Sequence, residues 1–330
     1  MSHTGAKGIT PMAITVRPLR RDQPADLDLF TDLSADPGRD ADVRAYLDRT
    51  IATGAMRPEW CYVAEDDGGV VGRVAAWTLP PSDVPLDLVL LDITWDEPDS
   101  RVGEALLRHL FGDMRALGGE RVGYVIDEPP REPFWQDNVA ARIALLERVG
   151  FRLTRETSRF ELLIRDVPEP SMRITFRDLT AVGQDAFLDA IRLVSDGTLD
   201  QEILEERERE GPEGAARLLW GLLTKLRYEP SWWQLAYDHE GTLVGPVMPC
   251  ANPGAATIGY IGVVPEQRGK GYVDDLIVQV TRTRNLAGYD RIVADTDLRN
   301  APMAAAFGRA GYAPFGTRKE FAIELNTSMA

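Results

Sequence analysis

The order of apolar and polar positions predicts the same run of strands and helices twice along the chain. In the first half, residues 60–77 alternate as a hairpin around a turn at residues 66–69. An apolar strand follows at residues 86–95, and apolar positions at helical spacing follow at residues 102–117. A further strand and a helix that ends at Gly150 complete the pattern.

The second half shows the same order. Residues 232–248 carry the hairpin pattern, residues 256–264 the apolar strand and residues 273–287 the helix. A later helix ends at Gly311, and an aromatic residue follows it, as one also follows Gly150. This repetition at domain size predicts an α/β fold with two similar tandem domains, each a mixed central sheet flanked by helices.

The domain boundaries follow from local composition. The segment MSHTGAKGITPM has no apolar stretch, so we expect a disordered tail at residues 1–12. The polar, proline-bearing stretch RDVPEPS at residues 165–171 is typical of a linker. The predicted domains are therefore residues 13–164 and residues 172–330.

The acidic balance of the chain limits its partners. The 330 residues carry a formal net charge of -15 at pH 7, which argues against nucleic acid because phosphate binding needs a basic face. The charge is compatible with a cationic small molecule, and solubility alone explains it as well. No apolar run could span a bilayer and no secretory signal is present, so we expect a cytoplasmic protein without a membrane partner, as a monomer or a homodimer.

Cysteine and histidine are too sparse for a metal site or a histidine-based triad. Cys61 and Cys250 lie far apart in strand-like sequence, which predicts buried thiols rather than a disulfide framework or zinc ligands. The histidines, His3, His109 and His239, do not cluster. We therefore expect no metal cofactor.

The stretch VVPEQRGKGYVDD, residues 263–275, places a short basic loop between a strand and a helix. The first turn of a helix presents unpaired N–H groups and the positive end of the helix dipole. Gly269 and Gly271 would let backbone amides approach an anion closely, and Arg268 and Lys270 add positive charge. A diphosphate suits such a site, and a plain tight turn is the alternative.

Three phosphate-binding motifs compete for this loop. A dinucleotide fingerprint fails because Asp274 stands at its third glycine, and the Walker A motif is absent. The third motif is Arg/Gln-x-x-Gly-x-Gly/Ala after a Val-x-Pro strand end. Here Arg268 takes its first position and Gly271 its central glycine, while Val273 departs from the usual Gly or Ala.

With this motif, the segment RIVADTDLRNAPMAAAFGRAGY at residues 291–312 makes the second domain resemble the GNAT family of N-acetyltransferases. The two-domain layout is similar to tandem members of the mycothiol synthase type. The resemblance implies an N-acyltransferase that moves an acetyl group from acetyl-CoA to a primary amine of a small molecule, with its site in the second domain.

The resemblance also implies where acetyl-CoA would lie. Its pyrophosphate would rest on the amides of Arg268 to Val273, and its pantetheine arm would pair with Ile261 to Val264. An N–H group of Gly262 or Val263 could polarise the thioester carbonyl. The predicted cofactor-binding residues are Ile261, Gly262, Val263, Val264, Arg268, Gly269, Lys270, Gly271, Tyr272, Val273, Asn300 and Phe307.

The groups that would move protons are less clearly marked. The strand before the loop lacks the Glu common in the family, so Asp295 and Asp297 on the next strand are candidate bases, with turn or cap roles as the alternative. Tyr260 could offer a hydroxyl, or simply pack. The predicted catalytic residues are Tyr260, Asp295 and Asn300.

One departure from the family keeps a second function open. Phe307 stands where family members commonly carry the Tyr that protonates the departing thiolate, and phenylalanine cannot donate a proton. This substitution also fits an acyl-CoA-binding regulatory or scaffold module without turnover.

The equivalent first-half loop, DEPDSRVGEALL, reads as a degenerate copy. Ser100 replaces the Arg or Gln, and Asp96, Glu97 and Asp99 would repel a pyrophosphate. We expect the first domain to shape the acceptor pocket or support the second domain, and one equivalent of acetyl-CoA to bind per chain.

Overall fold

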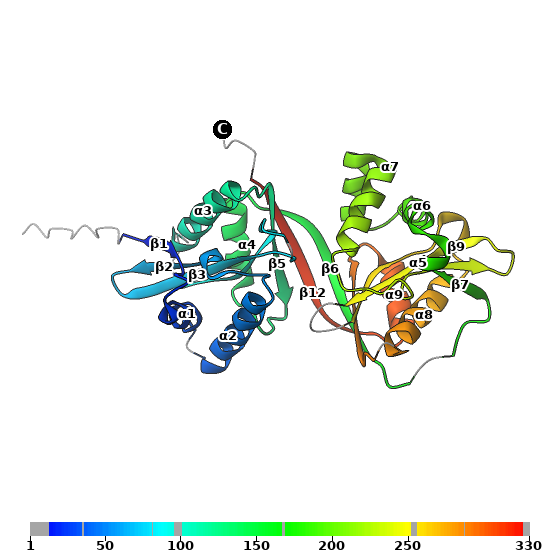
Figure 1. The fold of residues 1–330 in the computed structure, drawn as a ribbon, viewed down its shortest axis with the longest axis horizontal. Helices are drawn as coiled ribbons and strands as arrows, with labels where there is room; N and C mark the ends of the chain where they lie inside the picture. Colours follow the sequence, from blue (N-terminus) through cyan, green and yellow to red (C-terminus); the bar gives the residue numbers. More distant parts are fainter. Residues whose placement is uncertain are drawn as a thin grey trace, which may run out of the picture. The chain divides into compact units, whose positions relative to one another are not determined.

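The computed structural model divides the chain into two compact units (Figure 1). Unit 1 comprises Met1–Leu153 and Glu320–Ala330, and unit 2 comprises Thr154–Lys319. The predicted tail at residues 1–12 lies outside the described residues. The structure describes residues 13–34, 36–80, 82–95, 101–166, 169–251, 256–286 and 288–325.

Unit 1 is built on one sheet whose strands follow the order β1-β2-β3-β4-β5, with the carboxyl-terminal part of β12 beside β5. The pairs from β1 to β4 are antiparallel, and β4 and β5 are parallel. The strands are β1 (Thr15–Pro18), β2 (Cys61–Asp66), β3 (Gly69–Trp77), β4 (Asp87–Ile93), β5 (Arg121–Glu128) and β12 (Ala313–Glu324).

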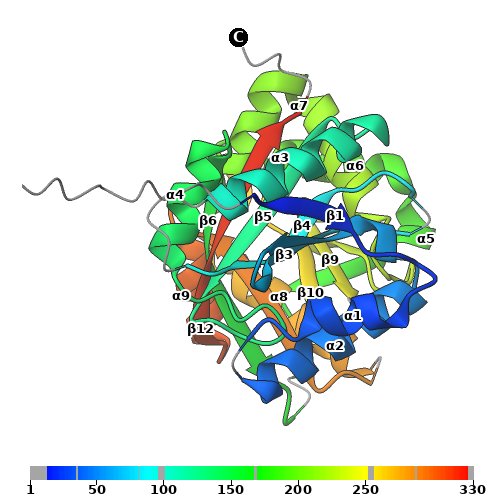
Figure 2. The same ribbon diagram turned by 90° about the vertical axis from the view of Figure 1, so that its left-hand side faces the viewer.

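Helices cover both faces of this sheet, because successive strand residues point to opposite sides. Tyr62 and Ala64 belong to the core under α3 and α4, whereas Cys61 and Val63 belong to the core under α1 and α2. Figure 2 shows α3 on one side of the sheet and α1 and α2 on the other. The helices are α1 (Pro24–Thr31), α2 (Pro37–Ala52), α3 (Arg101–Ala116) and α4 (Val139–Arg148), with a 3₁₀ turn, η1 (Pro58–Trp60).

Unit 2 repeats the design with the strand order β6-β11-β10-β9-β8-β7. Within this order β10 and β11 are parallel, and the other neighbouring strands are antiparallel. The strands are β6 (Arg152–Leu163), β7 (Ile174–Asp178), β8 (Gln234–Asp238), β9 (Leu243–Ala251), β10 (Ala256–Ile261) and β11 (Arg291–Asp297). The helices are α5 (Leu179–Val182), α6 (Gln184–Val194), α7 (Gln201–Leu223), α8 (Tyr272–Leu286) and α9 (Ala301–Arg309), with a 3₁₀ turn, η2 (Pro265–Gln267).

The helices of unit 2 again form two layers. The core that contains Leu276 and Phe307 lies under α8 and α9, and the core that contains Phe187 and Leu223 lies under α6 and α7. The fold class expected from the sequence is therefore confirmed: each half is a mixed sheet with helices on both faces.

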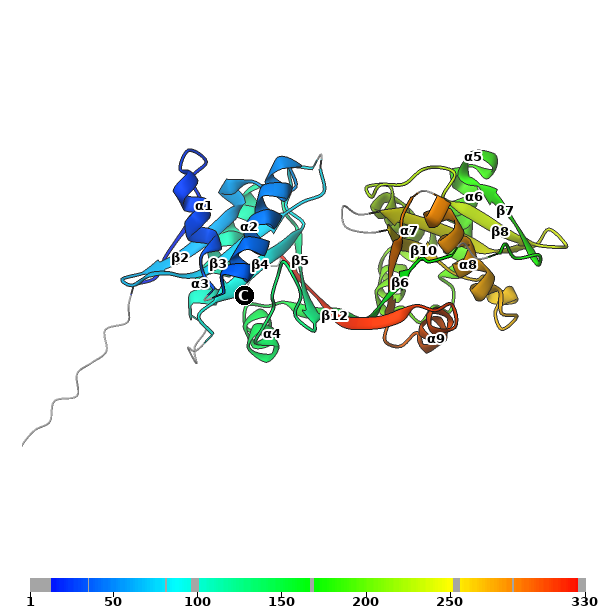
Figure 3. The same ribbon diagram turned by 90° about the horizontal axis from the view of Figure 1, so that it is seen from below.

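The last strand of each half extends into the other unit. From Thr154 onward β6 is part of unit 2, where it pairs with β11 over Arg291 to Asp297. The end of β12 is part of unit 1, where Phe321 and Leu325 enter the core. Figure 3 follows β12 from α9 to its carboxyl-terminal end. This division differs from the predicted boundary at residues 165–171, since the order of elements along a chain does not reveal which sheet a terminal strand completes.

Candidate functional site

The loop between β10 and α8 has the backbone shape of an anion-binding nest. Arg268 has φ of -64°, whereas Gly269 and Gly271 have φ of +77° and +78°. Lys270 between them has no positive φ. Alternation of this kind turns successive N–H groups toward one concavity, and only glycine adopts positive φ without strain.

The N–H groups of this loop are free for a ligand from Gly269 onward. Within the described part of the chain, the amides of Gly269 to Val273 have no hydrogen-bond acceptor. Tyr272 and Val273 open α8, where the amides of a first helical turn have no partner inside the helix. The amide of Arg268, by contrast, donates to the carbonyl of Pro265 at 3.2 Å.

The side chain of Arg268 holds the loop against the end of α6. Its guanidinium donates to four backbone carbonyl oxygens, which come from the strand end and from the end of α6. Nη2 reaches Val194 and Asp196 at 2.8 and 2.7 Å, and Nε reaches Val263 at 3.1 Å. Arg268 therefore clamps the loop onto the carboxyl end of α6, where carbonyls lack helical partners.

Other side chains fix the far side of the loop. Lys270 donates from Nζ to Gln267 Oε1 at 2.7 Å, and buried Gln267 donates from Nε2 to Asp238 Oδ2 at 3.2 Å. Arg173 donates to the carbonyl of Lys270 at 2.7 Å and pairs with Asp275 at 3.4 Å. Sequence reasoning missed Arg173 and Gln267, because nothing in their local pattern links them to the loop.

A gap opens between the two parallel strands next to this loop. β10 and β11 pair only at Ala256 with Ile292 and at Thr257 with Val293, after which they separate. The other edge of β11 remains paired with β6. The edge of β10 that faces β11 is therefore unpaired from residue 258 to residue 261 and can accept an extended, amide-bearing ligand by strand addition.

The hydrogen bonds of the strand end show which backbone amide is free to polarise a thioester carbonyl. The amide of Val264 donates to Val244 at 2.9 Å, and that of Gly262 donates weakly to Pro246 at 3.4 Å. The amide of Val263 has no backbone acceptor among the described residues. Of the two predicted donors, Val263 is thus the freer one.

The predicted catalytic side chains do not converge on one point. Tyr260 is buried beside α6 and α7, and burial raises its pKa well above the usual range of a phenol. Asp295 lies on β11 and pairs with Arg159, with 3.2 Å between Arg159 Nε and Asp295 Oδ1. Asn300 caps α9 by accepting a hydrogen bond from the amide of Met303 at 3.2 Å.

Two further predicted residues have structural roles, and that of Asp297 is the turn role given as its alternative. Asp297 accepts hydrogen bonds from the amides of Arg299 at 2.8 Å and Gln201 at 3.0 Å, so it organises the turn before α9. Phe307 is 1% exposed and lies in the core with its ring centroid 5.3 Å from those of Phe160 and Tyr312.

An ion pair that sequence reasoning missed lies at the start of α7. Asp200 caps α7 by accepting from the amide of Ile203 at 3.3 Å and also pairs with Arg155 of β6. Its negative charge acts on Tyr260. The N-cap could have been found from the sequence, since Asp200 directly precedes a helical pattern, but its partner on a strand 45 residues away could not.

Unit 1 fills the corresponding gap with an arginine. Arg142 of α4 is fully buried, and its Nη1 donates to the carbonyl of Leu91 in β4 and lies 3.4 Å from the hydroxyl of Tyr124 in β5. The corresponding turn of α9 carries uncharged Met303 and Ala304. The strand edge that is open in unit 2 is therefore blocked in unit 1. The acidic loop residues Asp96, Glu97, Asp99 and Ser100 lie outside the described residues.

Comparison with solved structures identifies the fold. The chain matches a GCN5-related N-acetyltransferase from Sphaerobacter thermophilus with a TM-score of 0.57 and 18% identity, over 94% of this chain and 96% of that one. The chain has the GNAT fold. It also matches the glucosamine N-acetyltransferase region of a fungal multi-domain GH3 β-N-acetylglucosaminidase, with a TM-score of 0.56 and 16% identity, over 96% of this chain and 38% of the other.

A tandem GNAT protein from the clavulanic acid biosynthesis pathway covers 96% of this chain and 100% of its own, at 17% identity and a TM-score of 0.47. No protein-family model matches the sequence, and no curated protein matches it. Because one fold can host unrelated functions, function must be argued from the site.

Proposed function

We propose that the protein is an acetyl-CoA-dependent N-acyltransferase that uses unit 2 and acts on a primary amine of a small molecule. One observation carries the proposal: the nest of free amides from Gly269 to Val273 adjoins the unpaired edge of β10. A diphosphate followed by an amide-bearing arm fits this juxtaposition, because the nest binds anions and the strand edge binds amides.

Different backbone groups of unit 2 would bind different parts of acetyl-CoA. The amides of Gly269 to Val273 would hold the pyrophosphate, and the edge of β10 would hold the pantetheine arm. Acetyl-CoA would supply an activated acetyl thioester. The free amide of Val263 would stabilise the negative charge that develops on the carbonyl oxygen, as preorganised N–H donors do in acyl transfer.

Tyr260 is poorly suited to proton transfer near neutral pH. Burial raises its pKa, so its hydroxyl keeps its proton and is a much weaker acid than the departing thiol, whose pKa is about 8.5. Asp295 is engaged with Arg159, which weakens the case for it as the base that receives the amine proton. We therefore propose that the amine loses its proton through water.

The alternative function is an acyl-CoA-binding module without turnover. Phe307 favours it, since this core side chain replaces the family's tyrosine donor and sits in close aromatic packing. A free-thiol release assay over a panel of primary amines separates the two functions. Release with at least one amine supports the transferase, and tight acetyl-CoA binding with no release by any amine supports the module.

Further expectations about the acceptor, the location, the oligomeric state and the tandem type belong to this proposal. The acidic chain suits a cationic acceptor, in a cytoplasmic monomer or homodimer. The tandem layout alone supports the mycothiol synthase type. Among the described residues, no helix is long and apolar enough to cross a bilayer, and no group of His, Cys, Asp and Glu side chains could hold a metal ion.

A further inference from the structure

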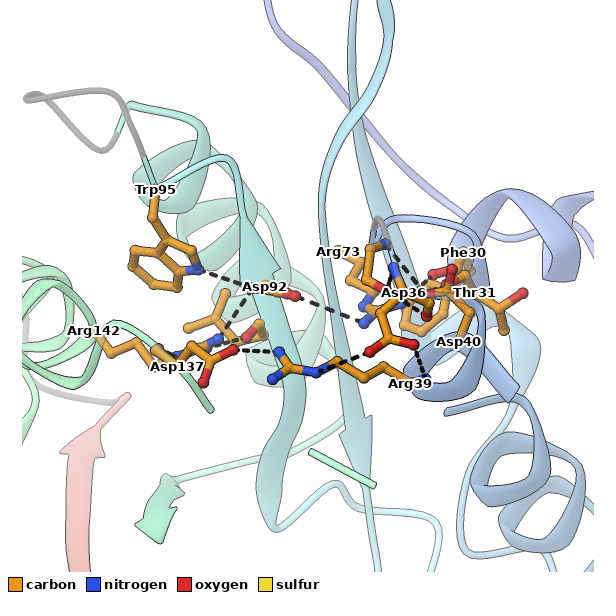
Figure 4. Close-up of polar contacts among 12 residues, drawn as sticks. Phe30, Thr31, Asp36, Arg39, Asp40, Arg73, Asp92, Trp95, Asp137 and Arg142 are labelled. Atoms are coloured by element: carbon orange, nitrogen blue, oxygen red, sulfur yellow. Dashed lines mark hydrogen bonds and ion pairs between the residues drawn. The ribbon is translucent and has the colours of Figure 1, made fainter. Parts of the chain in front are cut away.

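A cavity of about 170 Å³ lies in unit 1, at the carboxyl end of β4 (Figure 4). Its walls include Arg73 from β3, Asp92 from β4 and Arg39 from α2. Trp95 and Trp135 add aromatic surface. Charged groups and indole rings in one concavity are typical of a site that orients a small polar ligand.

Arg73 offers this cavity a buried donor without an acceptor. Its side chain is 5% exposed, and Nη1 donates to the carbonyls of Phe30 and Thr31, both at 2.9 Å. Nη2 makes no hydrogen bond among the described residues, and Asp92 Oδ2 lies 3.7 Å from it. Burial also lowers the pKa of Arg73 from its usual value. A buried guanidinium with an unsatisfied N–H is costly to maintain, and a ligand acceptor would remove that cost.

Asp92 offers the complementary acceptor. Its Oδ1 accepts hydrogen bonds from Trp95 Nε1 at 2.8 Å and from Arg142 Nη2 at 3.0 Å. Its Oδ2 lies 3.7 Å from Arg73 Nη2, an ion-pair separation that is too long for a hydrogen bond. One oxygen of Asp92 is thus held, while the other remains available beside Arg73.

The mouth of the cavity carries a second ion pair. Arg39 pairs with Asp137 and lies over the ring of Trp135, with 4.9 Å between the guanidinium carbon and the ring centroid. The side chains of Arg39 and Asp137 are 34% and 44% exposed, so this pair can exchange partners more easily than the inner groups.

The charges around the cavity are balanced but separated. Arg39, Arg73 and Arg142 oppose Asp92, Asp137 and Asp40, the last of which acts on Arg73. A simple anion would satisfy Arg73 and meet repulsion from the carboxylates, and a simple cation would do the reverse. A ligand that carries both charges satisfies both sets.

We propose that this cavity binds a small zwitterion that carries a carboxylate and an ammonium group, the chemistry of a free amino acid. The carboxylate accepts a hydrogen bond from Arg73 Nη2, and the ammonium donates to Asp92 Oδ2. Since the cavity is smaller than the 300 Å³ at the low end for drug-sized ligands, it selects a compact molecule. The site belongs to unit 1 alone, so the inference does not rest on the proposed acyl transfer in unit 2.

The indole N–H of Trp95 gives a direct readout, because it donates to Asp92. The full-length protein is titrated with each proteinogenic amino acid, and the Trp95 signal, assigned with W95F, is followed by NMR. We expect at least one amino acid to shift this signal with saturation. No shift with any amino acid up to about 10 mM, where even millimolar affinity would show, overturns the proposal.

Ligand derivatives test the two charges without altering the protein. For the amino acid that binds, its N-acetyl derivative lacks the ammonium and its amide lacks the carboxylate. We expect each derivative to bind at least tenfold more weakly. Equal affinity of the N-acetyl derivative would show an anion site, and equal affinity of the amide would show a cation site; either result overturns the zwitterion.

Two variants assign the binding to the cavity. D92N keeps the side-chain volume and should weaken binding at least tenfold in protein that retains its native spectrum. R21Q removes a surface ion pair with Glu59 in the same unit and should leave affinity unchanged. Unchanged affinity in folded D92N would place the ligand elsewhere and overturn the assignment.

Discussion

The guanidinium of Arg268 donates a hydrogen bond to the carbonyl oxygen of Val194, 2.8 Å away at the end of α6. The same side chain reaches Gly197 and Asp196, so one residue of the predicted anion loop supports the turn after α6. Gly262 is equally constrained, since a Cβ there would lie 2.2 Å from Val194 Cγ1. The loop, the strand end and α6 therefore support one another through direct contacts.

We therefore predict that R268A lowers stability more than it directly lowers affinity. Loss of charge-assisted hydrogen bonds to several carbonyls should cost about 1–2 kcal/mol of unfolding free energy, because the side chain is partly exposed. R268K should not rescue, since an ammonium cannot reproduce the planar fork. Urea unfolding measures the effect, with R209A, which removes an exposed pair with Glu210, as the control. Wild-type stability in R268A would contradict the clamp.

Gly271 tests the anion nest. G271V forces a β-branched residue into a backbone with φ of +78°, which should move the amides of the nest and weaken acetyl-CoA binding at least tenfold. The strain itself should cost about 1–3 kcal/mol of stability. G54V imposes similar strain at φ of +75° after α2 in unit 1, with open space around it. Calorimetry should find wild-type affinity in G54V; a matching loss there would mean that strain alone explains the result.

The stoichiometry of acetyl-CoA binding tests the role of Arg142. Because Arg142 occupies the strand gap of unit 1, one equivalent should bind per chain, and two would contradict the blocked edge. Gly103 lies in α3 of unit 1, away from the proposed cofactor site. A Cβ there would lie 2.4 Å from Leu145 Cδ2, so G103A should lower the stability of unit 1 by about 1–3 kcal/mol while binding in unit 2 is retained.

Acid should weaken unit 1 through Asp26. The Arg20 guanidinium holds both oxygens of Asp26 and, with the Arg20 amide and Arg17, keeps the pKa of this carboxyl well below its usual range, against the effect of burial. Its stabilisation is therefore complete above the unfolded-state pKa of about 3.9 and is lost as pH falls below that value. D26N should lower stability at pH 7 and flatten its decline below pH 4, whereas D67N, in an exposed turn, should follow the wild type.

The two cysteine thiols should not react with thiol reagents in the folded protein. Cys61 and Cys250 are fully buried, and burial raises the pKa of Cys250 to about 11 and that of Cys61 still further. The reactive thiolate is therefore scarce at pH 8. Ellman's reagent should detect no thiol before unfolding and two after it. A native reaction at either residue would show that its unit opens, and it would also interfere with the thiol release assay.

Much of the fold was predictable because its signals are local. The hairpin turns, the glycines that end α4 and α9, and the glycine loop before α8 all depend on residues within a few positions of one another. The prediction of buried thiols at Cys61 and Cys250 is confirmed for the same reason, since both lie in apolar strands.

The side-chain partners were not predictable, because they join distant segments. The local sequence predicts Arg268 as a ligand of an anion in its own loop, yet three of its four acceptors lie more than 70 positions away. The helix pattern around Arg142 predicts an ordinary charged residue of an amphipathic helix. In the structure, Arg142 blocks a strand gap between Leu91 and Tyr124. Whether the predicted cofactor contacts form stays a prediction that the binding experiments decide.

The exchange of terminal strands delays the folding of unit 1 until the end of the chain has been translated. Unit 1 completes its core with Phe321 and Leu325, so it cannot finish folding when Leu153 leaves the ribosome. At 5–20 residues per second, the wait from Leu153 to Glu320 lasts roughly 10–30 s. Throughout that time the edge of β5 lacks its final neighbour and can pair with another nascent chain. The yield of soluble protein should therefore depend on how fast the second half is translated.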